Sequence, residues 1–130
     1  MKVLQPASWP RPKGYSNAIE AQGRTIFVAG LVGWTAEEVF EAKDLPGQFE
    51  QILHNLMALL AEGNAGPEHV VRMTWYITDK QAYLAGIKQI GEAYRRIMGK
   101  NFPVMAVVQV VALMEDDALI EIEATAVVPD

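Results

Sequence analysis

The sequence predicts an α+β domain in which two amphipathic helices cover one face of a mixed sheet. Two stretches repeat apolar residues at helical spacing, and several short runs are rich in β-branched and aromatic residues. These signals follow one another in the order β-β-α-β-α-β-β, without an internal repeat or a low-complexity segment. The 130 residues, 51% of them hydrophobic, suit a single domain over 1–130 with a dense core.

The N-terminal part predicts an arm followed by two strands. Three of the seven prolines fall within the first 14 residues and favour an extended or looped segment. Tyr15–Ala21 and Thr25–Ala29 are predicted as strands, and Gly23 between them suggests that they form a hairpin. Residues 30–47 are expected to be irregular because Gly33 and Pro46 interrupt them.

Both helices are predicted from their apolar periodicity. The first is expected at about Leu45–Glu62, where a Gly- and Pro-containing segment ends it. The second is expected at about Lys80–Met98, with Asp79 as its N-cap and Gly99 after its end. One apolar stripe on each helix indicates that both pack against the same sheet.

Three further strands complete the sheet. Val70–Thr78 reads as a strand, and Val104–Leu113 is apolar at almost every position, which is typical of a central strand covered on both faces. Leu119–Val128, with the sequence LIEIEATAVV, alternates in character. Its even-numbered residues are uniformly apolar and should pack under the helices, whereas Glu121 and Glu123 should lie on the opposite face.

The chain has no further helix to cover that opposite face. A second subunit is therefore expected to cover it. From alternation alone, the two glutamates fit either a solvated strand face with ion pairs or a functional site. A carboxylate there could handle protons.

Composition excludes several other functions. The net charge of −5 argues against nucleic acid as the main partner, and the absence of cysteine excludes disulfides and thiolate chemistry. No secretory signal or membrane span is recognised at the sequence level, so a cytoplasmic protein is expected. His54 and His69 lack metal-ligand spacing and no phosphate-binding glycine motif occurs, so neither a metal nor a cofactor is expected.

Five short stretches, in this order, resemble one family. They are Gly14–Ala18 (GYSNA), Phe27–Gly30 (FVAG), Asn55-Leu56, Phe102-Pro103 and Ile120–Ala124 (IEIEA). Together they resemble the RidA (YjgF) family, also called the L-PSP endoribonuclease-like family, over nearly the whole chain. The resemblance implies a homotrimer with the helices outside and a small-molecule pocket at each subunit interface.

The resemblance also implies a reaction and a set of roles. The family reaction is hydrolysis of a reactive enamine or imine to a ketone and ammonia. By position, Glu121 would position or activate the water, Tyr15 and Gly30 would line the pocket, and Glu123 would be structural.

The substrate clamp of the family is missing. Relatives active on imino acids carry an arginine two residues after the Phe-Pro pair, where this chain has Met105, and Leu31 replaces a glutamine often found after the second strand. With Val107 nearby, the pocket should be more apolar than usual. Lys88 or Arg72 could supply another cation, although each also fits an ordinary surface residue.

The sequence therefore predicts a RidA-like deaminase-type hydrolase that acts on an imine, enamine or related C–N compound, and not on a small 2-imino acid. A non-catalytic binder of a small apolar metabolite in the same pocket is the alternative. RNA cleavage is a third reading, against which the acidic charge argues.

Overall fold

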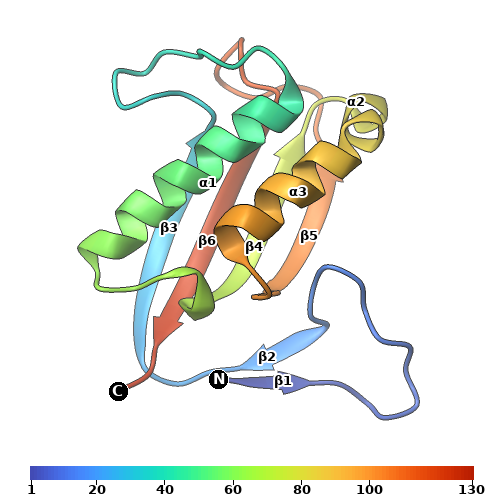
Figure 1. The fold of residues 1–130 in the computed structure, drawn as a ribbon, viewed down its shortest axis with the longest axis vertical. Coiled ribbons are helices and arrows are strands. Elements are labelled where there is room, and N and C mark those ends of the chain that lie inside the picture. The colour runs from blue at the N-terminus through green and yellow to red at the C-terminus, as the bar shows by residue number, and fades with distance from the viewer.

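The fold was obtained as a computed structural model that describes all 130 residues. Its elements are β1 (Lys2–Leu4), β2 (Ala18–Glu20), β3 (Arg24–Val32), α1 (Leu45–Glu62), η1 (Pro67–His69), β4 (Val70–Ile77), α2 (Lys80–Ala85), α3 (Ile87–Met98), β5 (Val104–Gln109) and β6 (Ile120–Val128). Two layers result, with α1 and α3 lying side by side on one face of a four-stranded sheet (Figure 1). The predicted α+β class is confirmed.

The main sheet has the strand order β3-β6-β4-β5. β6 runs antiparallel to both of its neighbours, whereas β4 and β5 are parallel. The connection between β4 and β5 passes through α2 and α3, as a parallel pair requires. β1 and β2 form a separate antiparallel ribbon beyond one end of the sheet (Figure 1).

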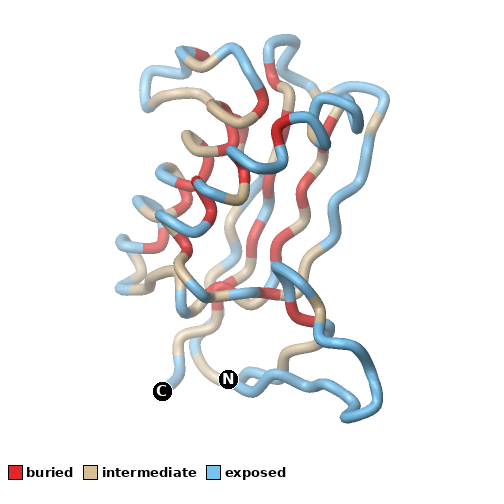
Figure 2. The backbone as a smooth tube through the Cα atoms, turned by 45° about the vertical axis from the view of Figure 1, so that its right-hand side comes forward, coloured by how far each residue is buried: buried red, intermediate tan, exposed pale blue.

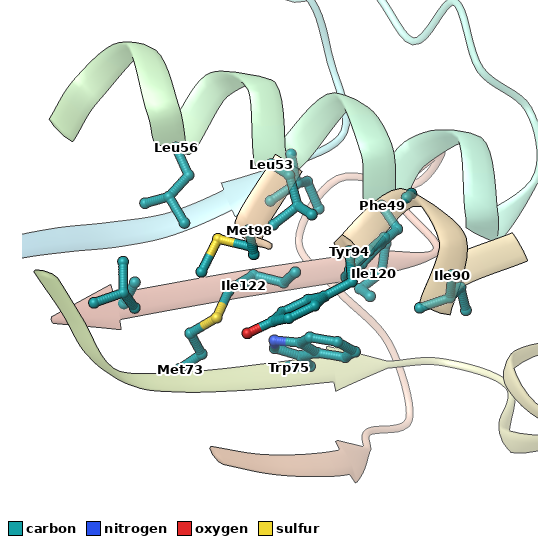
Figure 3. Close-up of a cluster of buried hydrophobic side chains, with 14 of the residues drawn as sticks. Phe49, Leu53, Leu56, Met73, Trp75, Ile90, Tyr94, Met98, Ile120 and Ile122 are labelled. Atoms are coloured by element: carbon teal, nitrogen blue, oxygen red, sulfur yellow. The ribbon is translucent and has the colours of Figure 1, made fainter. Parts of the chain in front are cut away.

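α1 occupies the range that its periodicity predicts. The Asp44 side chain caps its N-terminus by accepting a hydrogen bond of 3.0 Å from the Gly47 amide, and Gly63 follows its last turn. Its buried face carries Phe49, whose ring centroid lies 4.8 Å from that of Trp75 on β4. Figure 3 shows the resulting core, in which residues from α1, α3, β4 and β6 interleave.

One buried polar side chain fixes the loop before β6 to α1. Gln48 is 1% exposed; its amide nitrogen donates to the carbonyls of Asp117 and Ala42, and its oxygen accepts from the Leu119 amide. These three bonds satisfy the buried amide group. They also fix where β6 begins.

The alternation predicted for the last strand is confirmed. Ile120 and Ile122 are 0% and 1% exposed beneath the helices, whereas Glu121 and Glu123 lie on the other face of the sheet. Figure 2 shows the same division, with buried positions alternating along the strands and gathered on the inner sides of the helices.

The predicted hairpin of the second and third strands is wrong. β2 pairs with β1, in a register that places Val3 opposite Ile19, and β3 pairs with β6. The turn at Gly23 has φ +148°, and a Cβ there would lie 2.1 Å from the Val128 carbonyl oxygen. This close approach to the end of β6 directs the chain into the main sheet instead of back along β2.

The single helix predicted over residues 80–98 is interrupted. α2 ends at Ala85 and α3 begins at Ile87, with Gly86 between them. A Cβ on Gly86 would lie 2.8 Å from the Pro46 side chain, so the first turn of α1 approaches this point closely. The predicted Asp79 cap is confirmed, since its carboxylate accepts from the Gln81 and Ala82 amides.

The prediction of a central strand at Val104–Leu113 is also wrong. β5 ends at Gln109 and forms one edge of the sheet; its only strand neighbour is β4, and a single isolated bridge joins its first residue, Val104, to Ser16. Val107 and Val108 are exposed, and so is Val111 beyond the strand. The apolar run therefore reflects an uncovered edge and not a position inside the sheet.

Alkaline pH is expected to destabilise the fold through Tyr94. This side chain is buried, its hydroxyl donates to the Asn101 carbonyl, and burial raises its pKa. Because the unfolded chain releases this proton near pH 10 while the folded chain retains it, stability should fall as pH rises above about 10. The free energy of unfolding can be measured in urea at several pH values between 8 and 11. Its decrease with rising pH should be shallower by up to about 1.4 kcal/mol per pH unit in Tyr94→Phe than in the wild-type protein. Equal slopes in both proteins would contradict this assignment.

Candidate functional site

The sheet face opposite the helices, here called the open face, has no cover within the subunit. Its register aligns Tyr76 with Glu121, Thr74 with Glu123, and Phe27 with Thr125. Phe27 is 81% exposed. Polar and charged groups thus stand beside a large exposed ring, an arrangement that suits burial against another protein surface.

Glu121 lies against the backbone of Gly30 on this face. A Cβ on Gly30 would lie 2.2 Å from a Glu121 carboxylate oxygen, so the carboxylate would have to leave this position if residue 30 were larger. Residues 29–30 fall in a register shift of β3, and the strand continues to Val32, which corrects the irregular segment predicted from residue 30. The Glu121 side chain forms no hydrogen bond or ion pair within the subunit.

Glu123 is engaged, in contrast. Its carboxylate accepts a hydrogen bond of 2.7 Å from the Tyr76 hydroxyl. That bond is the main reason why the pKa of Tyr76 lies above its ordinary value, and desolvation and the negative charges of Glu123 and Glu121 add to it. The two glutamates therefore differ: one carboxylate is free and the other is held.

A shallow groove of about 610 Å³ crosses the open face beside Glu123. Arg72 lines it together with Phe27 and Thr125. No acidic group lies within ion-pair distance of the Arg72 guanidinium. A free cation and the Glu123 carboxylate thus share this groove.

A second cavity, here called the β5 cavity, lies between α3 and the edge strand and has a volume of about 540 Å³. The register pairs Met105 with Met73 and Val107 with Trp75, so both β5 side chains point toward the helix side of the sheet. Tyr15, from the N-terminal arm, also lines this cavity. Three of the residues predicted for the pocket are thus brought together.

The other predicted residues lie elsewhere. Leu31 packs against the core and borders a hollow with Trp34 and Asn55. Lys88 is exposed on α3 and does not line the β5 cavity. Within one subunit, the predicted site is therefore divided between the open face and the β5 cavity.

Several lining residues of the β5 cavity were not anticipated from the sequence. They are Lys13, Trp75, Tyr83, Gly91, Tyr94 and Arg95. Gly91 gave the one available signal, since a glycine in the middle of a helix costs about 1 kcal/mol relative to alanine and calls for a reason. The others are contributed by segments far apart in the chain.

No three His, Asp or Glu side chains gather in an arrangement that could hold a metal ion. No helix combines the length and apolar character needed to cross a membrane.

Comparisons with known proteins agree on one family. Residues 8–128 match the family model described as Endoribonuclease L-PSP. The chain is 30% identical over 129 residues to the RutC family protein UK114 of Drosophila melanogaster, which covers 96% of this chain and 88% of that protein. It is 35% identical over 120 residues to a RutC family protein of Pyrococcus abyssi, with 90% and 89% covered.

Solved structures show the same likeness. The Rid family protein YyfB of Yersinia pestis, whose function is described as unknown, superposes with a TM-score of 0.83 at 36% identity, covering 98% of both chains. RidA of an Antarctic Psychrobacter superposes with a TM-score of 0.70 at 25% identity, covering 98% of this chain and 100% of that one.

Proposed function

The chain belongs to the RidA/YjgF family, and from this membership we propose that it is a deaminase-type hydrolase acting on an imine, enamine or related C–N compound. Membership supports an imine or enamine deaminase at the level of the family. The observation that carries the proposal for this chain is the free Glu121 carboxylate beside Gly30, next to a Glu123 that Tyr76 already holds.

The site is proposed to form between subunits of a homotrimer. Two observations support this arrangement: the open face has no cover, and the predicted pocket residues are divided between two surfaces of one subunit. A partner seated on the open face would bury Phe27 and could bring its β5 edge toward Glu121. The exposed valines of that edge would gain cover in the same contact.

The proposed reaction needs only water. Glu121 takes a proton from a water molecule as its oxygen attacks the imine carbon, and the C=N electron pair moves to nitrogen, which takes that proton from Glu121. The resulting carbinolamine then loses ammonia: Glu121 takes the hydroxyl proton as the oxygen forms the carbonyl, and passes it to the leaving nitrogen as the C–N bond breaks. One water is consumed, and one ketone and one ammonia are formed.

The substrate is proposed to be larger and more apolar than a small 2-imino acid. Met105 offers neither charge nor hydrogen-bond donor, and Val107 beside it is apolar. A carboxylate held by arginine in a bidentate pair would have no counterpart at this position. An apolar substituent, by contrast, fits the aromatic and aliphatic lining of the β5 cavity.

The test is to compare imines generated in place. An amino-acid oxidase converts phenylalanine or alanine to its imine, and freshly made 2-aminoacrylate supplies a small enamine; ammonia release is followed with and without the protein. We expect faster hydrolysis of the bulky imine than of the two small compounds, and a trimer by light scattering. Preferred turnover of 2-aminoacrylate would refute the interpretation of Met105.

The same experiment distinguishes an enzyme from the alternative, a non-catalytic binder of a small apolar metabolite. If none of these compounds is hydrolysed while an apolar ligand raises the melting temperature, the protein is a binder and not an enzyme. Met105 and the apolar cavity favour this second candidate function as much as they favour a bulky substrate. The net charge of −5 continues to argue against RNA cleavage.

A further inference from the structure

The β5 cavity contains features that the C–N chemistry does not explain. We propose that it binds a small aromatic monocarboxylic acid, whose ring packs among the aromatic side chains and whose carboxylate contacts Arg95 and Lys13. The inference rests on the proposed function in one respect, because Met105 and Val107 line the same cavity. It names the chemical class that this pocket admits.

Gly91 opens the cavity. It sits in the middle of α3 and lines the cavity, and the only atom near its missing Cβ is a guanidinium nitrogen of Arg95, at 3.4 Å. A side chain longer than that of alanine would place atoms in the space between the helix and β5. The cost of a glycine inside a helix thus has a reason, which is to keep this space open.

The walls of the cavity are aromatic. The Trp75 ring centroid lies 6.5 Å from that of Tyr83 and 6.4 Å from that of Tyr94, and Tyr94 is stacked on Phe102 at 6.0 Å. All four rings line the cavity. Such a continuous set of rings suits a flat apolar ligand, because aromatic pairs gain from offset and edge contacts at these distances.

Trp75 also leaves a polar group unpaired. The residue is 4% exposed, and its Nε1 is buried without a hydrogen-bond partner. Figure 3 shows the indole next to the Tyr94 ring, with its nitrogen at the end where the Tyr94 hydroxyl lies. A buried unpaired donor costs about 1–3 kcal/mol, but Nε1 has almost no accessible surface, so a ligand in the cavity is expected to contact the indole ring and not its nitrogen.

The charged groups of the cavity are both cationic. Lys13 and Arg95 line it, no acidic residue does, and neither cation has an ion-pair partner. The neighbouring Arg96 differs, because it pairs with Glu50 on α1. In a chain with a net charge of −5, two free cations beside an aromatic cavity favour an anionic ligand.

The test is a calorimetric titration of the full chain with 3-phenylpropionate at low salt. Its uncharged amide and propionate are the controls that lack the charge and the ring, respectively. We expect the acid to bind at least about 10-fold more tightly than either control. Arg95→Gln should remove most of that advantage, whereas Arg96→Gln, the matched control, should keep it.

Substitutions at Gly91 test the cavity itself. Gly91→Leu should abolish binding by filling the space, and Gly91→Ala should retain it, while both variants fold because alanine and leucine favour helix. Equal affinity for acid and amide, or undiminished binding in Gly91→Leu, would overturn the proposal. If Gly91→Leu loses binding of the probe and also changes its oligomeric state, the proposal would likewise be overturned, because a second subunit and not a ligand would then occupy the cavity. Because the readout is binding, hydrolysis can fail while this proposal stands, and the reverse.

Discussion

Replacing Glu121 with glutamine is expected to lower the rate of C–N hydrolysis by about 100-fold or more. Glutamine keeps the shape of the side chain against Gly30 but cannot take a proton from water, and positioned general bases typically contribute 10²–10⁴-fold. The carboxylate is free of hydrogen bonds and ion pairs within the subunit, so the loss should appear in kcat. The measurement is ammonia release from the oxidase-generated imine that the wild-type protein hydrolyses fastest.

Glu123→Gln is the matched control. Its amide oxygen can still accept the hydrogen bond from Tyr76, so the rate should stay within a few-fold of wild type. Both variants should have the melting temperature and oligomeric state of wild type. Equal losses in the two variants would mean that the negative charge of the whole face matters, and that Glu121 has no separate role.

Local patterns predicted the elements whose ends are determined by nearby residues. α1 has the predicted bounds because its apolar stripe, its Asp44 cap and its terminal glycine all lie within the segment itself. Strand pairing depends instead on which distant segment comes alongside. The predicted β2–β3 hairpin failed for that reason: the partner of β2 is Lys2–Leu4, a run of three residues too short to recognise in advance.

The apolar run at Val104–Leu113 failed for a different reason. A strand inside a sheet with both faces covered and an edge strand to be covered by another subunit carry the same pattern of residues. Only the neighbours of β5 distinguish them, and the subunit supplies one neighbour, β4. The residue pattern alone could not distinguish the two positions, and the prediction of a central strand failed for that reason.

The residues of the candidate site were also predicted only in part. Strand alternation placed Glu121 on the open face, and a position after the Phe-Pro pair identified Met105. The cations beside Met105 were expected at Lys88 or Arg72, but Lys13 and Arg95 line the cavity. Arg72 shares its face of the sheet with Val104, its partner in the register, and so points away from Met105. No spacing rule links the N-terminal arm, α3 and β5, so this part of the site required the structure.

Replacing Met105 with arginine is expected to raise kcat/KM for 2-aminoacrylate by about 10- to 100-fold. A guanidinium at this position would offer two parallel donors to the substrate carboxylate, and hydrogen bonds to charged groups contribute about 1.5–3 kcal/mol. The edge position of β5 leaves a long side chain room to reach the cavity mouth with little burial of its charge. Steady-state assays on 2-aminoacrylate and on the phenylalanine-derived imine measure the change.

Two matched variants separate the possible causes of such a gain. Met105→Leu keeps the position apolar and should leave the small substrate unchanged, whereas Met105→Lys adds charge without the planar fork and should give a smaller gain than arginine. With Lys13 and Arg95 nearby, the new cation should also lower the melting temperature slightly, because three like charges repel. Turnover in Met105→Arg no better than in Met105→Leu would mean that the methionine does not occupy the carboxylate position. The preference for bulky substrates would then have to come from the width of the cavity, which Gly91→Leu tests independently.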